Sequence, residues 1–424
     1  MAKTIGKLSR MEIFRYILLF LYFLSISAFR LGEGFDAAFV RVIFVAIMFF
    51  SIFRKKKMII YGIFVWAVIF WVFYFLSALW ASNASDTLSN VALAIQILGL
   101  FIFIPTYITD KKSMNIVLKL LLCSLVCTAF ILLAKTPLSD FGTVRLGEAI
   151  GLNPNAFGLR MAIGAIIALY LFHIEDKTNK FHRILFLVTI LVLFGFALLS
   201  GSKKALVAII LGLIGCELLL AKGIKVVMKI IGISLAIFAL FVLIFSNQQF
   251  YDIIGFRLEK TFYTLTDQAS SKYTDRSLEE RRFYIERAIN LFKRYPIAGY
   301  GGNNFRTYMG EINYSHVAYS HNNYVELLST LGIIGFFIYY SLWVVALYWL
   351  IKIFLYEKKK DGCSPATVLF LTMLVILLVL DYGMVGYCSE FNMLVFCLIY
   401  LYAWSRKKTI VKIQSEREKY AIES

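Results

Sequence analysis

Charged residues are scarce in this sequence: Asp, Glu, Lys and Arg make up only 17% of its 424 residues, whereas 60% are hydrophobic. That balance excludes a soluble multidomain enzyme and is typical of a polytopic membrane protein. The formal net charge of +18 does not indicate a nucleic-acid-binding protein. Lys and Arg cluster in short loops between apolar runs, as the orientation of membrane helices requires.

Motifs for nucleotide, metal and redox chemistry are also absent. The sequence has no GxxxxGK[ST] phosphate loop, no HExxH or DxD pattern and no CxxC pair. It therefore predicts neither ATP hydrolysis nor a bound metal or other cofactor. Four of the six cysteines lie within apolar runs and are interpreted as small hydrophobic residues: Cys123, Cys127, Cys216 and Cys397. Because further apolar runs follow the first one, we expect a retained helix rather than a cleavable signal peptide.

Apolar runs dominate what is present. About twelve of them are long enough, or nearly so, to cross roughly 30 Å of hydrocarbon as helices. The expected spans are 12–30, 36–53, 58–80, 88–108, 115–134, 154–173, 182–200, 204–221, 226–246, 323–351, 365–381 and 391–405. Short loops between the fifth and ninth runs leave a count of about eleven or thirteen open.

These runs predict an all-α polytopic membrane protein in four parts. Residues 1–246 would hold transmembrane helices 1–9, and residues 247–322 a large extracytoplasmic catalytic loop. Residues 323–405 would hold transmembrane helices 10–12, followed by a cytoplasmic tail in 406–424. Every second connection is basic, as at Arg54–Lys57 and Lys358–Lys360. Basic loops stay in the cytoplasm, so both termini should be cytoplasmic and the long loop should face outward.

The long polar loop is the most informative stretch. Connections as long as 247–321 usually indicate function. A helical, amphipathic spacing is expected over Asp275–Tyr295, with apolar residues at Phe283, Ile285, Ala288, Ile289 and Phe292. Pro296 should end this helix, and Gly299, Gly301 and Gly302 should supply a flexible turn. A basic amphipathic helix most often lies on a lipid surface; alternatively, its Arg281 and Arg282 face a phosphate.

Cations at or inside the outward ends of spans are candidates for anion binding. Arg145 precedes the Asn153-Pro154-Asn155 start of a span, and Arg160 lies within that span, where charge is costly. Lys203 and Lys204 follow a Ser-Gly-Ser turn on the outward side, where the orientation rule disfavours them. An anionic partner explains that placement. The alternatives are a solvated loop cation for Arg145 and lysines that snorkel to lipid phosphates.

His321 is the candidate general base. It lies in the outward loop just before the apolar run that begins Asn323-Tyr324, and imidazole exchanges protons near neutrality. The alternative is a capping or hydrogen-bonded loop histidine. Glu326 lies five residues further on, away from the ideal helical position facing His321, and is assigned a supporting role only. The other histidines are less suitable: His173 and His182 should be cytoplasmic, and His316 lacks a helical context.

Four segments resemble the bacterial O-antigen ligase and Wzy-type O-antigen polymerase family. They are RLGEAIGLNPNAFG, SGSKKALVAIILG, RRFYIERAINLFKRYPIAGYGGNNF and SHNNYVELLSTLGIIGFFIYY, and they occur in the order found in the family. The resemblance implies a metal-independent glycosyltransferase in the bacterial cytoplasmic (inner) membrane, acting on a glycan linked to undecaprenyl diphosphate. It implies that Arg145 and Arg281 bind the diphosphate and that His321 is essential. The family has arginine where this chain has Lys203, which retains the charge but not the bidentate geometry.

The resemblance leads to an expected function with two alternatives. We expect a polymerase that joins lipid-linked repeat units of O-antigen or capsular polysaccharide at the outer face of the membrane. A ligase that moves the finished polymer to a lipid A-core or cell-wall acceptor shares the same motifs. A lipid-linked glycan transporter is less consistent, because charge gathers at the outer face and no internal repeat is evident. The implied partners are the lipid-linked donor, an acceptor glycan, membrane lipid and other polysaccharide-assembly proteins.

Overall fold

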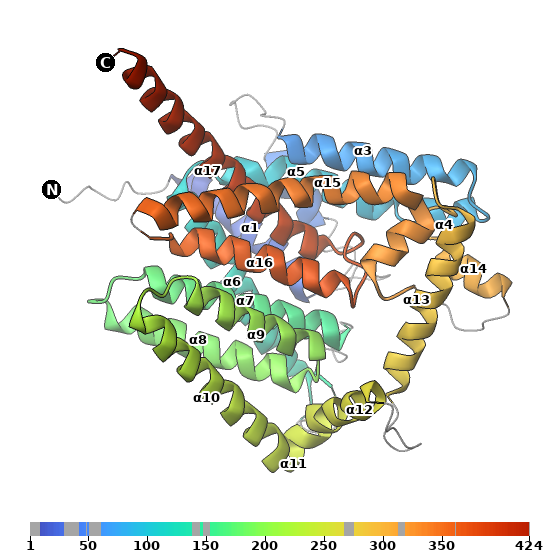
Figure 1. The fold of residues 1–424 in the computed structure, drawn as a ribbon, viewed down its shortest axis with the longest axis horizontal. Coiled ribbons are helices and arrows are strands. Elements are labelled where there is room, and N and C mark those ends of the chain that lie inside the picture. Colours follow the sequence, from blue (N-terminus) through green and yellow to red (C-terminus); the bar gives the residue numbers. More distant parts are fainter. Residues whose placement is uncertain are drawn as a thin grey trace.

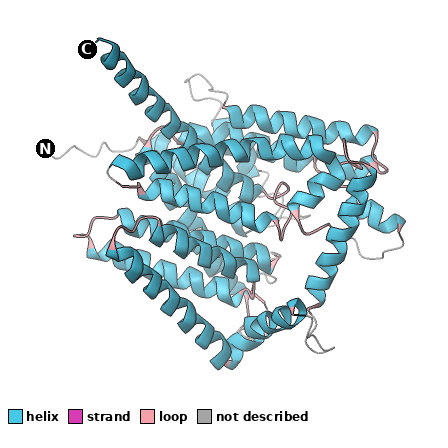
Figure 2. Cartoon of the chain, in the orientation of Figure 1, coloured by secondary structure: helices cyan, strands magenta, loops and turns pink. Residues whose placement is uncertain are grey.

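The computed structural model describes residues 9–28, 42–47, 49–50, 61–137, 145–146, 153–266, 275–312, 319–360 and 362–423. Within these residues the chain forms helices joined by loops, without strands (Figure 2). The helices are α1 (Arg10–Ala28), α3 (Gly62–Leu76), the 3-10 helix η1 (Ser77–Leu79), α4 (Ala84–Leu88), α5 (Val91–Tyr107), α6 (Lys111–Lys135), α7 (Pro154–Ile174), α8 (Lys180–Leu199), α9 (Lys203–Leu218), α10 (Ile224–Ser246), α11 (Gln248–Phe250), the π-helix η4 (Tyr251–Gly255), α12 (Phe256–Leu265), α13 (Arg276–Arg294), α14 (Phe305–Glu311), α15 (Asn323–Lys360), α16 (Pro365–Asp381) and α17 (Glu390–Glu423).

The all-helical, polytopic expectation is confirmed, but the expected twelve spans are not. Eight helical segments of the described ranges are long and apolar enough to cross a membrane: α1, α3 with η1, α4 with α5, α6, α7, α8, α10 and α15. Helices α9 and α16 have 16 and 17 residues, so they rise only about 24–26 Å, less than the roughly 30 Å of a hydrocarbon core. The expected span 36–53 lies largely outside the described residues, and α17 continues through Arg406 into the expected tail.

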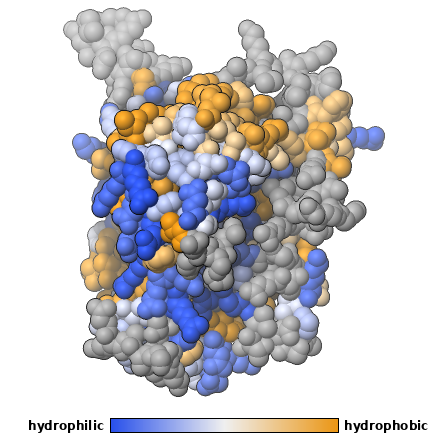
Figure 3. Space-filling model, turned by 90° about the vertical axis from the view of Figure 1, so that its right-hand side faces the viewer, coloured by the Kyte–Doolittle hydropathy of each residue, from blue (hydrophilic) through white to orange (hydrophobic). Residues whose placement is uncertain are grey.

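The long helices form a bundle with two distinct ends (Figure 1). The far end of α17 lies toward one end, and the loop helices α13 and α14 lie across the other, which we call the loop end. Hydrophilic residues gather over the middle of the loop end, with hydrophobic residues toward its upper rim (Figure 3). The bundle is closely packed at its centre, where Trp343 of α15 stacks on Phe396 of α17 with ring centroids 4.0 Å apart. In a bilayer such packing, rather than exclusion of water, holds helices together.

Glycine allows α7 to lie directly against the Ser-Gly-Ser turn between α8 and α9. A Cβ atom at Gly158 would lie 2.3 Å from the Ser200 hydroxyl oxygen and 2.9 Å from the Ser202 Cβ. Only a residue without a side chain therefore fits at this position. The close approach places the start of α9 beside the start of α7 at the loop end.

A backbone exchange fixes the end of the long loop to α15. Gly332 interrupts α15 with φ 65° and ψ −169°, which frees backbone groups on both sides of the kink. The loop pairs with these groups: the Tyr300 and Gly301 N–H groups donate to the carbonyls of Ser329 and Thr330 at 3.0 and 2.8 Å. A Cβ atom at Gly299 would lie 2.3 Å from the Thr330 carbonyl. The loop glycines therefore permit close backbone contact, and the expectation of a flexible turn is wrong.

The amphipathic loop helix is confirmed as α13, but its buried stripe differs from the expected one. Tyr284, Ala288 and Leu291 are its buried residues, at the i, i+4, i+7 spacing of one helix face. They pack with Tyr300, Phe305, Tyr308 and Met309 of the same loop. Ile289, which we expected in the stripe, is 40% exposed. The buried face of α13 therefore packs against other residues of the loop, and the position of this helix relative to the lipid surface stays a prediction.

Candidate active site at the loop end of the bundle

A cavity of about 370 Å³ opens at the loop end. Its polar and charged lining comes from six parts of the chain: the residue before α5, the start of α7, the start of α9, the turn before α14, the segment that leads into α15, and the connection between α16 and α17. His321, Glu326, Lys204 and Tyr319 all line it, together with the amides of Asn90, Asn153, Asn155 and Asn303. The cavity therefore brings together residues that lie far apart in the sequence and that include the candidate base and one candidate cation.

The turn that carries His321 is held by its neighbours. Asn322 caps α15, since its side-chain oxygen accepts from the N–H groups of Tyr324 and Val325 at 3.0 and 3.3 Å. The Ser320 hydroxyl donates to the Asn322 carbonyl at 2.9 Å. His321 itself has φ 57°, a left-handed conformation that costs energy for a residue with a side chain. Asn322, rather than His321, caps the helix, so the capping alternative for His321 is wrong.

Aromatic rings hold the His321 imidazole. The Tyr319 ring lies 4.1 Å from it, centroid to centroid, and the Tyr284 ring stacks at 5.9 Å. Among the described residues no hydrogen bond or ion pair engages the imidazole. Burial, together with the positive charges of Arg281 and Lys204, lowers the pKa of His321 to about 4. The imidazole is therefore neutral at physiological pH and can accept a proton.

The two adjacent lysines at the start of α9 have different environments. Lys203 forms an ion pair with Asp275 and donates a hydrogen bond to Thr261. Burial raises the pKa of Asp275, but hydrogen bonds from Lys203 and Thr261 outweigh it, and the net pKa is lowered. Lys204, about 100° further around the helix, lines the cavity and has no hydrogen-bond partner among the described residues. The structure therefore places Lys204, and not Lys203, beside His321.

The candidate arginines lie at different distances from the cavity. Arg145 donates to the Ser200 carbonyl at 3.2 Å and to the side-chain oxygen of Asn155, a cavity residue, at 3.1 Å. Arg281 is half-buried on α13 and close enough to His321 to lower its pKa, whereas the adjacent Arg282 is exposed. Neither arginine lines the cavity itself, but Arg145 bonds a lining residue and Arg281 acts electrostatically on another, whereas Arg282 points to the surface.

Arg160 lies away from this site. It donates to the Ser27 carbonyl at 3.0 Å and its guanidinium lies 5.5 Å from the Phe391 ring centroid. It is not among the residues that line the cavity. Its position between α1, α7 and α17 indicates a buried contact between helices.

Glu326 has a clear structural contact. It is 3% exposed, lines the cavity, and accepts a hydrogen bond from the Ser320 N–H at 2.8 Å. The carboxylate therefore ties the segment before His321 to the first turn of α15. Spacing along one helix did not reveal this contact, because residue 320 lies outside α15.

Sequence reasoning missed a buried polar network behind the His321 turn. The Asn323 amide nitrogen donates to the Tyr340 hydroxyl at 2.8 Å and to the Asp381 carboxylate at 3.2 Å. The Asn323 amide oxygen accepts from the N–H groups of Gly386 and Tyr387 at 2.8 and 3.2 Å. This network fixes α15 to the wall of the cavity. The signal was present, since Asp381 is a carboxylate at the end of an apolar run.

The other histidines are remote or outside the described part. His173 pairs with Glu217 at 2.6 Å and His182 with Glu175 at 3.0 Å, at the end of the bundle opposite to the loop end. His316 lies outside the described residues, as does most of the RLGEAIG stretch. Among the residues that are described, no three His, Cys, Asp or Glu side chains gather as metal ligands would.

Part of the chain, including most of these candidate site residues, is similar to a known protein family. Residues 187–340 match the family model Wzy_C, described as O-antigen ligase. This part of the chain is therefore similar to the O-antigen ligase family. The matched region includes Lys203, Lys204, Arg281, His321 and Glu326. It confirms the family resemblance and contains three of the four sequence segments, whereas RLGEAIGLNPNAFG precedes it. It supports a membrane enzyme of O-antigen processing with polymerase or ligase activity. A search of curated proteins found no match to this chain.

Proposed function

We propose that this protein is a membrane glycosyltransferase that polymerises glycan repeat units carried on undecaprenyl diphosphate. The observation that carries the proposal is the loop-end cavity, where a neutral His321 lies beside Lys204 and close to Arg281. A base and a cation that line one cavity, with a second cation close to the base, suit a reaction that removes a proton from one oxygen and builds negative charge on another.

The proposed step is a substitution at the anomeric carbon of the donor sugar. The acceptor hydroxyl forms the new glycosidic bond, the bond between that carbon and the diphosphate oxygen breaks, and undecaprenyl diphosphate leaves with the bonding electrons. The hydroxyl proton passes to the unprotonated nitrogen of His321. Lys204 and Arg281 stabilise the charge that grows on the leaving diphosphate. The diphosphate is already a good leaving group, so no nucleotide is needed, and we propose that no metal is needed either.

Donor binding should itself strengthen His321 as a base. In the free enzyme Arg281 and Lys204 disfavour the imidazolium form. A bound diphosphate would place negative charge next to those two cations and reduce their effect on the imidazole. The pKa of His321 should then rise toward its ordinary value of about 6.5. A base with a pKa nearer to the working pH transfers protons more effectively.

Lys203 is proposed as a positioning residue rather than a direct contact to the donor. Its ion pair with Asp275 joins the start of α9 to the residue that caps α13. Arg281 lies on α13, two turns beyond that cap. The Lys203–Asp275 pair would therefore set the distance between Lys204 and Arg281, the two cations that act on the diphosphate.

Ligase activity is the second candidate, favoured by the description of the matched family model as O-antigen ligase. The glycan pattern of a deletion strain separates the two candidates. Single repeat units on the final acceptor would indicate a missing polymerase, whereas full-length chains retained on the carrier lipid would indicate a missing ligase. Restoration by the parent gene and not by the His321→Ala gene would assign the effect to the proposed site.

A further inference from the structure

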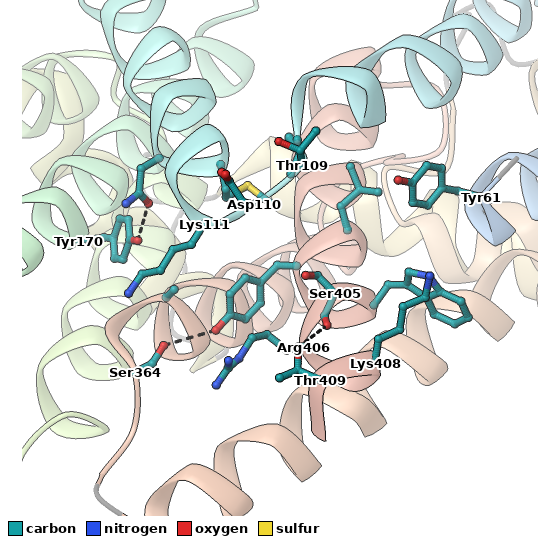
Figure 4. Close-up of a pocket in the computed structure, with 17 residues that line it drawn as sticks. Tyr61, Thr109, Asp110, Lys111, Tyr170, Ser364, Ser405, Arg406, Lys408 and Thr409 are labelled. Atoms are coloured by element: carbon teal, nitrogen blue, oxygen red, sulfur yellow. Dashed lines mark hydrogen bonds between the residues drawn. The ribbon is translucent and has the colours of Figure 1, made fainter. Parts of the chain in front are cut away.

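A second cavity, of about 350 Å³, opens at the end of the bundle opposite to the proposed active site (Figure 4). It shares no lining residue with the first cavity. Helix α7 contributes Ala156 to the first cavity and Tyr170 to the second, and these residues are about 21 Å apart along the helix. The second cavity is therefore a separate site that the proposed glycosyl transfer does not use.

The lining of this cavity favours an anion. Lys111 of α6 and Arg406 and Lys408 of α17 supply three positive charges, whereas Asp110 is the single carboxylate among the lining residues (Figure 4). Asp110 is engaged in capping α6, since its side chain accepts from the Ser113 N–H at 2.7 Å. Its pKa is lowered chiefly by that bond. The negative charge of Asp110 is therefore directed at the helix start.

Some donor atoms of these cations have no hydrogen-bond partner among the described residues. Arg406 forms an ion pair with Glu357 through one terminal nitrogen, but its Nε is buried and has no hydrogen-bond partner. Lys111 has no hydrogen-bond partner among the described residues. A guanidinium group and two ammonium groups line this one cavity, and groups of this kind bind the oxygens of a phosphate.

The position of the cavity indicates which phosphate it would meet. Trp404 and Tyr61 border it beside the cations, and aromatic rings with Lys and Arg are typical of the headgroup level of a membrane. The same end carries the basic run Lys358–Lys360 at the end of α15. Basic pockets between helices on the cytoplasmic side commonly hold anionic lipid headgroups.

We propose that this second cavity binds the phosphate of an anionic phospholipid headgroup in the leaflet opposite to the proposed active site. Lys111, Arg406 and Lys408 contact the phosphate oxygens, and the aromatic side chains lie at the junction between headgroup and acyl chains. The inference rests on the cavity and its cations alone and does not depend on glycosyl transfer.

Native mass spectrometry of the purified full chain, titrated with phosphatidylglycerol or phosphatidylcholine, tests this proposal. The site variant is Lys111→Ala with Lys408→Ala; the matched control is Lys112→Ala with Lys407→Ala, which removes two neighbouring charges that do not line the cavity. We expect the site variant to bind phosphatidylglycerol at least about 10-fold more weakly, because it loses two charge-assisted contacts to the phosphate. The control should stay within about two-fold of the parent, because Lys112 and Lys407 do not line the cavity.

One further variant pair and one further ligand complete the experiment. Replacing both site lysines by arginine should retain binding, and a single peak in gel filtration checks that each variant is folded. Equal weakening by the two alanine pairs, no weakening by either, or equal retention of the two lipids would overturn the proposal. Millimolar inorganic phosphate is the third ligand. If it binds the lipid-free parent and not the site variant, the occupant is a soluble phosphate and the lipid assignment is wrong.

Discussion

The protonation state of His321 is the property on which the proposed chemistry depends most directly. With a pKa of about 4, about 97% of the imidazole is neutral at pH 5.5, compared with about 9% at the ordinary pKa of about 6.5. The chain has only four histidines, so replacing His173, His182 and His316 by asparagine leaves His321 as the only imidazole. Diethyl pyrocarbonate reacts with neutral imidazole, and its rate of reaction with this protein therefore follows the neutral fraction.

We expect that rate to change by less than about two-fold between pH 7.5 and pH 5.5, rather than the roughly ten-fold drop of an ordinary histidine. Lys204→Met removes the smaller of the two charge effects that lower the pKa of His321, so it should move the inflection upward, while burial, the largest cause, still keeps it below the ordinary value. Lys112→Met removes a charge at the opposite end of the bundle and should leave the curve unchanged. An inflection near pH 6.5 in both the parent and the Lys204→Met protein would refute this account of the site.

Other predictions follow from the same contacts. Lys203→Ala leaves the Asp275 carboxylate without its cation, and we expect it to lower the free energy of unfolding, measured by thermal or denaturant melting, by about 1–3 kcal/mol. The double variant Lys203→Ala with Asp275→Asn should recover part of that loss. Strict additivity of the two changes would contradict the pairing. In the pH profile of kcat/KM, which reports the free enzyme, the acidic inflection should lie near pH 4. In the pH profile of kcat it should lie at higher pH, because the bound diphosphate favours imidazolium. Coincident inflections would contradict the effect of the donor. Turnover of the purified enzyme should survive EDTA, and loss that added divalent ion restores would exclude a metal-free reaction. An impermeant thiol reagent should label intact cells carrying Arg282→Cys and not those carrying Lys359→Cys, and the reverse pattern would overturn the proposed orientation.

The bundle was predictable from hydropathy because each span is a local property of one apolar run. Span count was less predictable. Helices such as α9 and α16 are too short to meet the length of a full span, and they are held by the helices around them. Length alone cannot separate such helices from full spans.

Residue types in the site were predictable, but their partners were not. Lys203 and Lys204 look equivalent in sequence, yet Asp275, 72 residues away, engages one of them. The buried stripe of α13 was misplaced for a similar reason. Tyr284 is buried in the cluster that includes Tyr308, whereas the more apolar Ile289 is 40% exposed. Contacts of this kind depend on tertiary packing, which a periodicity argument does not include.

The loop glycines illustrate a different limit. Their positions were visible, but a glycine signals both a flexible turn and a close backbone approach. Gly299 and Gly332 belong to the second class because the loop and the kinked α15 exchange backbone hydrogen bonds. Recognising this requires knowing that residue 299 meets residue 330, which one sequence does not provide.

The most direct test of the central claim is the turnover of purified His321→Ala in vesicles supplied with a lipid-diphosphate-linked repeat unit. Release of the carrier diphosphate and growth of the glycan are followed together, with His316→Ala as the matched control from the same loop. The account predicts a rate about 10²- to 10⁴-fold below the parent for His321→Ala, the usual cost of removing a positioned general base, with normal expression and folding, and an active control. Parent-level turnover by well-folded His321→Ala would contradict it.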